Sequence, residues 1–212
     1  MLEVYTKNIC NNPVGDLNYN KIILHFYVQG FDEKLKMMNT FLNNKKEQFI
    51  NQTIIKAKEI IVNKLVPIIA EIGESLEGCF FSDHLSNTIT NHRIDNAIGV
   101  CDILINKSIT NMLEIGFNAG FSSLLMLLIN PHINLTCVDI CEHQYTMPCF
   151  NFIKSMFPNR INLIKGSSEF VLPELVKQGN KYDMIHIDGG HSNRIFFHDT
   201  QNSIKLINKD GI

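Results

Sequence analysis

Short apolar runs alternate with helical patterns through the second half of the chain. Runs typical of buried strands lie at 112–115, 135–140, 161–164 and 184–187, and helical patterns of apolar and polar residues follow them at 121–129, 148–157, 169–178 and 193–207. Buried strands that alternate with helices of this length predict βαβ units and a parallel sheet. Because the crossovers of such a sheet are right-handed, its ligand site is expected at the carboxyl ends of the strands.

The first part of the chain has a different pattern. Residues 1–20 are rich in Asn and contain Pro13 and Gly15, which predicts a loop. The apolar run 22–28 has a β-like composition and is closed by Gly30, so we expect a strand there.

A long helix is expected next. Asp32 is placed as its N-cap, the helical pattern covers 33–72, and Pro67 should kink or divide it. After a stretch broken by glycine and polar residues, a short helix over 94–105 leads into the second half.

These elements predict two parts. An N-terminal strand and helical cap would cover 1–91, and a Rossmann-like, doubly wound α/β core with a mostly parallel sheet would cover 92–212. The chain ends in the turn-like residues 208–211 and Ile212, which we expect to open a fifth strand. Soluble proteins avoid a hydrophobic sheet edge, so we expect either a fragment or a partner that covers the fourth strand, a second copy of the chain included.

Composition excludes several classes of protein. Of the 212 residues, 45% are hydrophobic and 19% charged, which is enough apolar surface for a core and argues against disorder. The net charge of −2 offers no basic field to hold nucleic acid or an anionic membrane. No apolar run reaches the roughly 18 residues of a membrane helix, and residues 1–10 lack the apolar core of a signal peptide.

The six cysteines are irregularly spaced, and several lie inside apolar runs. This predicts reduced thiols and a cytoplasmic location rather than a disulfide framework. Zinc binding by Cys137, Cys141, His143 and Cys149 is disfavoured, because Cys137 lies in a predicted strand and the spacing matches no usual site.

The strongest candidate for chemistry is a glycine turn between the first strand and its helix. Gly116 permits a tight turn, Gly120 permits close approach of backbone to a ligand, and Glu114 precedes the first glycine by two residues. The pyrophosphate fingerprint Gly-x-Gly-x-x-Gly is absent, so the turn suits a nucleoside without phosphates. Asp139 ends the second strand 19 residues after Gly120, where an acid can accept hydrogen bonds from ribose. A plain strand–helix turn and a strand-end cap are the structural alternatives.

With these motifs in order, residues 111–191 resemble the class I S-adenosylmethionine-dependent methyltransferases, of the small-molecule O-methyltransferase type typified by catechol O-methyltransferase. The resemblance implies a methionine-binding motif over 114–122, a ribose-binding acid at Asp139 and an adenine segment over 166–169. The cofactor-binding residues that it implies are Glu114, Gly116, Phe117, Asn118, Gly120, Ser122, Asp139, Ile140, Ser167, Ser168, Glu169 and Asp188.

The segment 188–191, Asp-Gly-Gly-His, follows the fourth strand. The resemblance implies that Asp188 binds a divalent metal such as Mg²⁺ and that His191 is the general base, a role that suits histidine near neutral pH. A loop residue or a helix cap is the alternative for His191. The family's other metal ligands follow a fifth strand, beyond residue 212.

Two other polar positions are weaker candidates. His186 is interpreted as a core histidine with a satisfied hydrogen bond. His198 and Asp199 are expected to form hydrogen bonds between helix and loop.

The sequence therefore predicts methyl transfer from S-adenosylmethionine to an oxygen of a small molecule or sugar, with a divalent metal. A non-catalytic cofactor-binding or interaction module is the main alternative. A nicotinamide-dependent oxidoreductase is a second alternative, disfavoured by the glycine spacing.

Overall fold

The computed structural model describes residues 17–78, 80–83 and 86–212. The chain divides into two compact units, Met1–Gln48 and Phe49–Ile212. The sequence analysis places a boundary after residue 91 instead. Residues after Phe49 belong to the second unit, and the buried side chains of Ile54, Ile61 and Leu65 lie in its main hydrophobic core.

In the first unit the described residues are helical, which corrects three expectations. Helix α2 (Leu17–Ile60) includes the run 22–28, so the predicted strand is wrong. Gly30 and Asp32 lie inside the same helix, so Asp32 is not an N-cap. A helix satisfies its own backbone hydrogen bonds, whereas a strand needs a partner strand, and a short apolar run alone does not distinguish the two. Residues 17–20 are helical rather than loop, and 1–16 lie outside the described residues.

The long helical segment is divided near Pro67, as predicted. Alpha-helical geometry gives way to a π-helical turn, η1 (Ile61–Leu65), before α3 (Val66–Ile72) begins with Pro67 in its first turn. Proline has no backbone N–H to donate and is best accommodated at the start of a helix. The side chains of Ile61 and Leu65 are buried, which keeps this segment against the core.

The sheet of the second unit contains four parallel strands. These are β1 (Asn111–Ile115), β2 (Asn134–Asp139), β3 (Ile161–Lys165) and β4 (Met184–Ile187), in the order β3-β2-β1-β4. The chain reverses its direction of winding between β1 and β4, so both sit at the switch point where ligands bind in open α/β sheets. The predicted Rossmann-like parallel core is confirmed.

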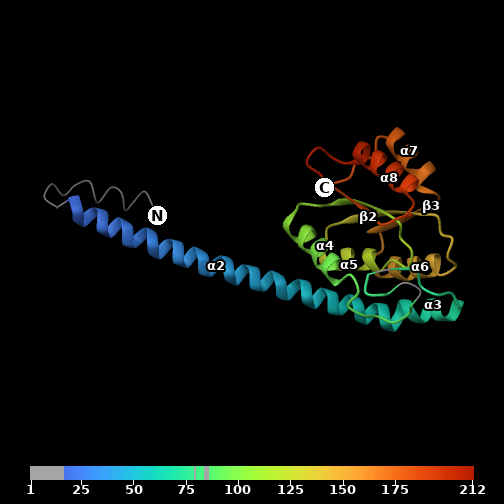
Figure 1. The fold of residues 1–212 in the computed structure, drawn as a ribbon, viewed down its shortest axis with the longest axis horizontal. Helices are drawn as coiled ribbons and strands as arrows, with labels where there is room; N and C mark the ends of the chain where they lie inside the picture. The colour runs from blue at the N-terminus through green and yellow to red at the C-terminus, as the bar shows by residue number, and fades with distance from the viewer. Residues whose placement is uncertain (1–16, 79, 84–85) are drawn as a thin grey trace. The chain divides into compact units, whose positions relative to one another are not determined.

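Helices cover both faces of the sheet (Figure 1). One face carries α3, α4 (Ile94–Asn106), α5 (Phe121–Ile129) and α6 (Thr146–Met156), and the other carries α7 (Ser168–Lys177) and α8 (Asn193–Leu206). Two hydrophobic clusters fill the layers: Met112 of β1 belongs to one, and Leu113 and Ile115 belong to the other. Because side chains alternate along a strand, β1 is buried on both faces.

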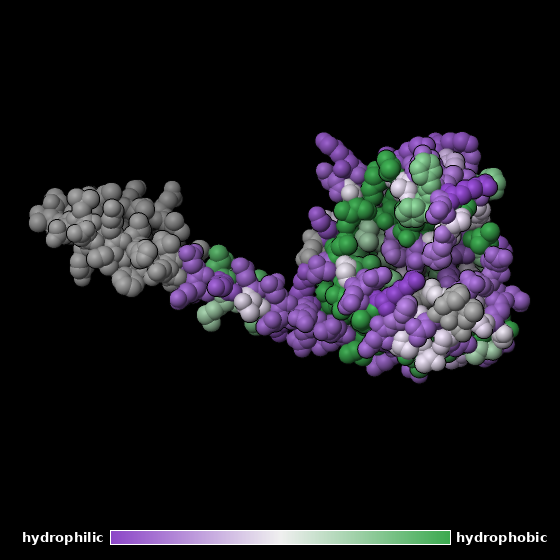
Figure 2. Space-filling model, in the orientation of Figure 1, coloured by the Kyte–Doolittle hydropathy of each residue, from purple (hydrophilic) through white to green (hydrophobic). Residues whose placement is uncertain are grey.

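The last residue pairs with the outer edge of β4. The Ile212 N–H donates to the Asp183 carbonyl at 3.0 Å, and the Ile212 carbonyl accepts from the Ile185 N–H at 2.9 Å. Figure 2 shows apolar surface between the positions that α4 and α8 occupy in Figure 1. Exposed apolar side chains on these helices include Ile103 and Ile204. Ile212 thus lies beside β4 at the place where the sequence predicts the start of a fifth strand.

Among the described residues, none of the helices combines the length and apolar character needed to span a membrane.

Candidate functional site

The glycine turn after β1 lies against the loop that follows β4. Gly116 has φ +93°, and a Cβ added to it would lie 2.2 Å from the Asp188 carbonyl oxygen and 2.8 Å from the Gly189 Cα. A side chain at this position is therefore excluded by backbone as well as by conformation. The consequence is that the segments predicted to bind donor and acceptor meet at the carboxyl ends of β1 and β4.

Gly120 is constrained by packing inside the protein. Its φ is +75°, and an added Cβ would lie 2.4 Å from the Phe117 ring and 2.7 Å from the Ile153 side chain. Phe117 is 1% exposed, so its side chain belongs to the core. The close approach that Gly120 permits is thus to the Phe117 ring, whereas the sequence predicts a close approach to a ligand.

Asp139 holds the glycine turn by its carboxylate. One oxygen, Oδ2, accepts from the backbone N–H groups of Phe117 at 2.7 Å and Asn118 at 2.8 Å. The other, Oδ1, accepts from the N–H of Cys141 at 2.6 Å. A carboxylate has about four acceptor positions, so Asp139 retains capacity for a further donor. It lies beside the turn where the sequence predicts it.

Glu114 is fully buried, and its carboxylate accepts hydrogen bonds from the following helix. The Ser122 hydroxyl donates to Oε1 at 2.5 Å, and the Ser123 hydroxyl donates to Oε2. His186 Nδ1 lies 3.3 Å from Oε1. Glu114 and Ser122, both predicted to contact the cofactor, therefore form a hydrogen bond with each other. This bond connects the strand before the glycine turn to the helix after it.

The predicted adenine side of the site contains one exposed apolar residue and two engaged polar ones. Ile140, directly after β2, is 58% exposed. Ser167 caps α7 by accepting from the Glu169 N–H, with Ser168 as the first helical residue. Glu169 forms an ion pair with Arg194 at 2.7 Å, which ties the start of α7 to the start of α8.

A polar network links the glycine turn to the segment after α3. The Asn118 side-chain amide donates to the Glu77 carbonyl at 2.6 Å, and the Tyr145 hydroxyl donates to Asn118 Oδ1 at 2.6 Å. His143 stacks on Tyr145 with ring centroids 4.8 Å apart, and its Nε2 lies 3.4 Å from a Glu77 carboxylate oxygen. Sequence reasoning missed Glu77 and Tyr145, because their contacts with Asn118 join residues 41 and 27 positions apart along the chain.

Asp188 directly follows β4 and lies in a partly buried, charged environment. Burial raises the pKa of its carboxyl above the ordinary value; the positive charge of His186 opposes this, and the Glu114 carboxylate adds to it. Arg93 and His191 also lower the pKa of Asp188, although less. His191 is exposed on the same loop. The structure thus brings the predicted metal ligand and the predicted base to one edge of the sheet.

His186 is held in place by acids on two sides. Burial lowers its pKa, but the hydrogen bond and charge of Glu114, together with the charge of Asp188, outweigh burial, so the pKa of His186 is raised. The interpretation of His186 as a satisfied core histidine is confirmed, since its side chain is only 17% exposed and is paired.

A cavity of about 380 Å³ opens beside Asp188. Its walls combine apolar side chains of Phe80, Val100 and Ile103 with the polar groups of Arg93 and Asn96. These residues precede β1, where the sequence carries no motif, so only the packing of α4 against the sheet reveals them.

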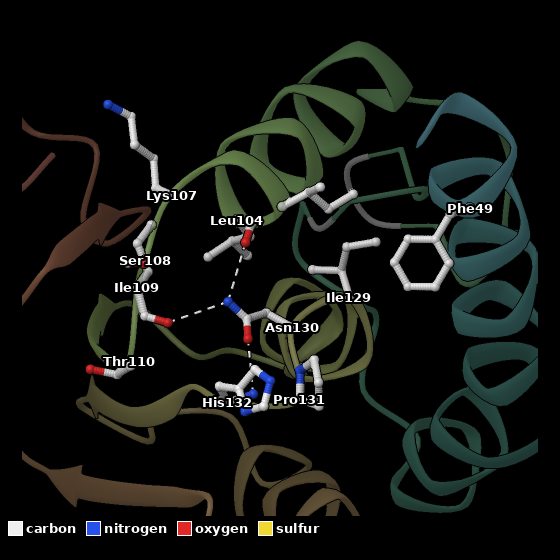
Figure 3. Close-up of a pocket in the computed structure, with 11 residues that line it drawn as sticks. Phe49, Leu104, Lys107, Ser108, Ile109, Thr110, Ile129, Asn130, Pro131 and His132 are labelled. Atoms are coloured by element: carbon white, nitrogen blue, oxygen red, sulfur yellow. Dashed lines mark hydrogen bonds between the residues drawn. The ribbon is translucent and has the colours of Figure 1, made fainter. Parts of the chain in front are cut away.

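A second cavity, of about 390 Å³, lies at the opposite end of the strands (Figure 3). The Asn130 side-chain amide donates to the carbonyls of Leu104 and Ile109, and its Oδ1 accepts from the His132 N–H. Asn130 thus satisfies its polar groups within the protein. This cavity is a structural junction, distant from the carboxyl ends where the chemistry is expected.

The magnesium site expected at Asp188 has no cluster of three protein ligands among the described residues. Within these ranges, no three His, Cys, Asp or Glu side chains are grouped so that they could hold a metal ion. Mg²⁺ prefers six oxygen ligands, and Asp188 supplies a single carboxylate.

Comparison with known proteins agrees with the fold. A family model described as a methyltransferase domain matches residues 113–212. A provisionally named O-methyltransferase from Klebsiella pneumoniae matches with a TM-score of 0.52 and 13% identity, over 70% of this chain and 60% of that chain. No curated protein sequence gives a significant match.

Two further structures show weaker overall likeness. The S-adenosylhomocysteine-bound methyltransferase PaMTH1 from Podospora anserina has a TM-score of 0.49 and 14% identity, over 75% of this chain and 59% of that chain. A provisionally named caffeoyl-CoA O-methyltransferase from Staphylococcus aureus has a TM-score of 0.48 and 22% identity, over 69% and 63%. The chain spans less than two thirds of the length of each of these structures.

The family match begins in β1 and includes the glycine turn, Asp139 and the loop after β4. Strand order and flanking helices agree with the same fold. Residues 113–212 are thus similar to a methyltransferase-domain family, and the chain shares the fold of the Klebsiella pneumoniae structure.

Proposed function

We propose that this protein transfers a methyl group from S-adenosylmethionine to a hydroxyl oxygen of a small molecule or sugar. The observation that carries the proposal is the contact between the Gly116 turn and Asp188, where an added Cβ would lie 2.2 Å from backbone. Through this contact the predicted donor site and the loop that bears His191 adjoin at one sheet edge.

The surroundings of the turn support a nucleoside-bearing donor. Asp139 stands beside the turn with acceptor capacity remaining, where ribose hydroxyls would donate. Ile140 exposes 58% of its surface next to it, and an apolar side chain there would cover one face of adenine. Burial of this exposed surface would contribute to donor affinity.

The cavity beside Asp188 supports a small acceptor. Its volume of about 380 Å³ lies in the usual range of small-molecule sites. Apolar walls with a few polar groups suit a compact hydroxylated molecule. The net charge of −2 gives no support to a nucleic-acid acceptor.

In this reaction the donor supplies an electrophilic methyl group. His191 would accept the proton of the acceptor hydroxyl as the oxygen–methyl bond forms and the sulfur–methyl bond breaks. The turn and the loop would align the two reactants, which is the main source of rate in such transfers. Asp188 would orient the acceptor and stabilise the protonated base.

Titration of the protein with S-adenosylmethionine, S-adenosylhomocysteine and NAD tests the donor. Binding of the two sulfur compounds but not NAD is expected. Binding of NAD alone would overturn the proposal in favour of an oxidoreductase, and binding of none would overturn it altogether.

Methyl transfer to a panel of catechols and sugars, read as S-adenosylhomocysteine formed, tests the reaction. His191→Ala should reduce turnover roughly 10²–10⁴-fold, whereas His132→Ala, at the distant cavity, should leave it unchanged. Parallel assays with EDTA and with added Mg²⁺ test the metal dependence that the sequence predicts. Wild-type turnover by His191→Ala across pH 6–9, about the titration range of histidine, would show that another group is the base.

A further inference from the structure

Asp199 is a buried carboxylate without a hydrogen-bond partner among the described residues. It lies on α8, is 0% exposed, and neither Oδ1 nor Oδ2 accepts a hydrogen bond there. Buried polar groups are normally paired, and an unpaired carboxylate is among the costliest groups to bury. The buried carboxylate of Asp199 is such an exception, and we therefore expect a hydrogen-bond donor that can reach it.

The carboxylate of Asp199 lies next to the loop 188–191. A Cβ added to Gly189 would be 3.4 Å from Asp199 Oδ2. The Nδ1 atom of His198 is 3.7 Å from Asp199 Oδ1, which is too far for a hydrogen bond. The acceptor is therefore directed at the loop and not at its own helix.

The loop offers donors that are also unused. It is held at both ends: the Asp188 N–H donates to the Ile115 carbonyl at 2.8 Å, and Ser192 caps α8. Between these points the N–H groups of residues 189–191 donate no hydrogen bond within the described part of the chain. Two consecutive glycines let these peptide planes rotate at little steric cost.

We propose that Asp199 is a positioning residue for this loop. A rotation of the peptide planes at Gly189 and Gly190 brings N–H groups of residues 189–191 within hydrogen-bond reach of its carboxylate, and this interaction fixes Asp188 and His191 relative to the Gly116 turn. Such bonds are charge-assisted and roughly twice as strong as neutral ones. The meaning for catalysis rests on the proposed function, because Asp188 and His191 act only if the domain transfers methyl groups.

Amide hydrogen exchange of Gly189 and Gly190 in ¹⁵N-labelled, ligand-free protein tests the inference. Asp199→Leu keeps similar volume without an acceptor, Asp199→Asn keeps one acceptor oxygen, and Ser203→Ala removes another unpaired buried oxygen one turn further along α8. Exchange should accelerate about tenfold in Asp199→Leu, which corresponds to the loss of one hydrogen bond. It should change little in Asp199→Asn and remain unchanged in Ser203→Ala.

Thermal unfolding separates positioning from simple support of the fold. Replacing a buried charged group by an apolar group of similar volume is often neutral or stabilising, because the desolvation penalty of the charge is removed with it. Asp199→Leu should therefore unfold at or above the wild-type temperature while its loop exchanges faster. Wild-type exchange of both glycines in folded Asp199→Leu overturns the inference. Asp199→Ala replaces it if the leucine variant does not fold, with the same expectation for exchange.

Titration of the same proteins with S-adenosylhomocysteine keeps the two proposals apart. If the wild type does not bind it but loop exchange depends on Asp199, the proposed function fails and the positioning role stands. If the wild type binds it and loop exchange is the same in every variant, the positioning role fails alone.

Discussion

Glu114 and His186 occupy paired positions on β1 and β4, and Oε1 of the first lies 3.3 Å from Nδ1 of the second. Paired residues of neighbouring strands project to the same face of a sheet. Glu114 also accepts from two serine hydroxyls at the start of α5. One buried carboxylate thus joins both strands of the switch point to the helix that follows the glycine turn.

The pairing predicts a pH-dependent contribution of His186 to stability. Its pKa is raised in the folded protein, so the folded state binds more protons than the unfolded state between about pH 6.5 and that raised pKa. The contribution is complete below the lower limit and is lost as pH rises through the folded-state pKa. Urea unfolding of wild type and His186→Gln should show a stability difference that shrinks with rising pH. A difference independent of pH would contradict this assignment, and His132→Ala serves as an exposed-histidine control.

Gly116→Ala should abolish S-adenosylhomocysteine binding and destabilise the fold. Its Cβ would collide with the Asp188 carbonyl, in addition to the strain of φ +93°. Gly179→Ala is the matched control, with φ +75° and no atom within 4 Å of the added Cβ. The Gly179→Ala substitution should lower the free energy of unfolding only by the cost of a side chain at positive φ, about 1 kcal/mol. This variant should bind S-adenosylhomocysteine with wild-type affinity. Chemical denaturation and calorimetric titration measure both effects, and equal losses in the two variants would refute the steric argument.

Asp139→Ala should weaken S-adenosylhomocysteine binding by about 1.5–3 kcal/mol, the range for hydrogen bonds to a charged group. The substitution removes the predicted acceptor of the ribose hydrogen bonds. It also removes the carboxylate oxygen that accepts from the N–H groups of Phe117 and Asn118. Asp139→Asn should fall between Ala and wild type. Glu142→Ala, nearby and exposed, is the control for titration calorimetry. Unchanged affinity in a folded Asp139→Ala protein would remove the ribose-binding role.

Ile140→Ala should weaken S-adenosylhomocysteine binding about tenfold, through lost apolar contact of roughly 1.4 kcal/mol. Because Ile140 is 58% exposed in the free protein, the unfolding temperature of the Ile140→Ala variant should differ little from that of the wild type. Ile204→Ala removes a more exposed isoleucine, 69%, from α8 and should affect neither quantity. A loss of stability in place of affinity would mean that Ile140 supports the fold rather than the donor.

Local patterns predicted most of the core. Helix α5 and strand β4 begin and end at the expected residues, because a strand–turn–helix unit with clear apolar periods is determined by neighbours in sequence. The run 22–28 was misassigned because a short apolar pattern fits a strand as well as a helix. The run is helical as part of the much longer helix α2, whose residues on both sides continue the same backbone hydrogen bonding.

The site was predicted as a set of positions, and tertiary structure decided what each one does. Sequence alone placed Asp139 at the end of β2 and glycine at 116 in the turn. Tertiary packing determined that Glu114 is enclosed by serines and His186, that Gly120 accommodates Phe117, and that Arg93 and Asn96 line a cavity. The contact between Glu114 and His186, for example, joins residues 72 positions apart along the chain. The energies of these contacts depend on distance and burial in three dimensions, which no local pattern of residues encodes.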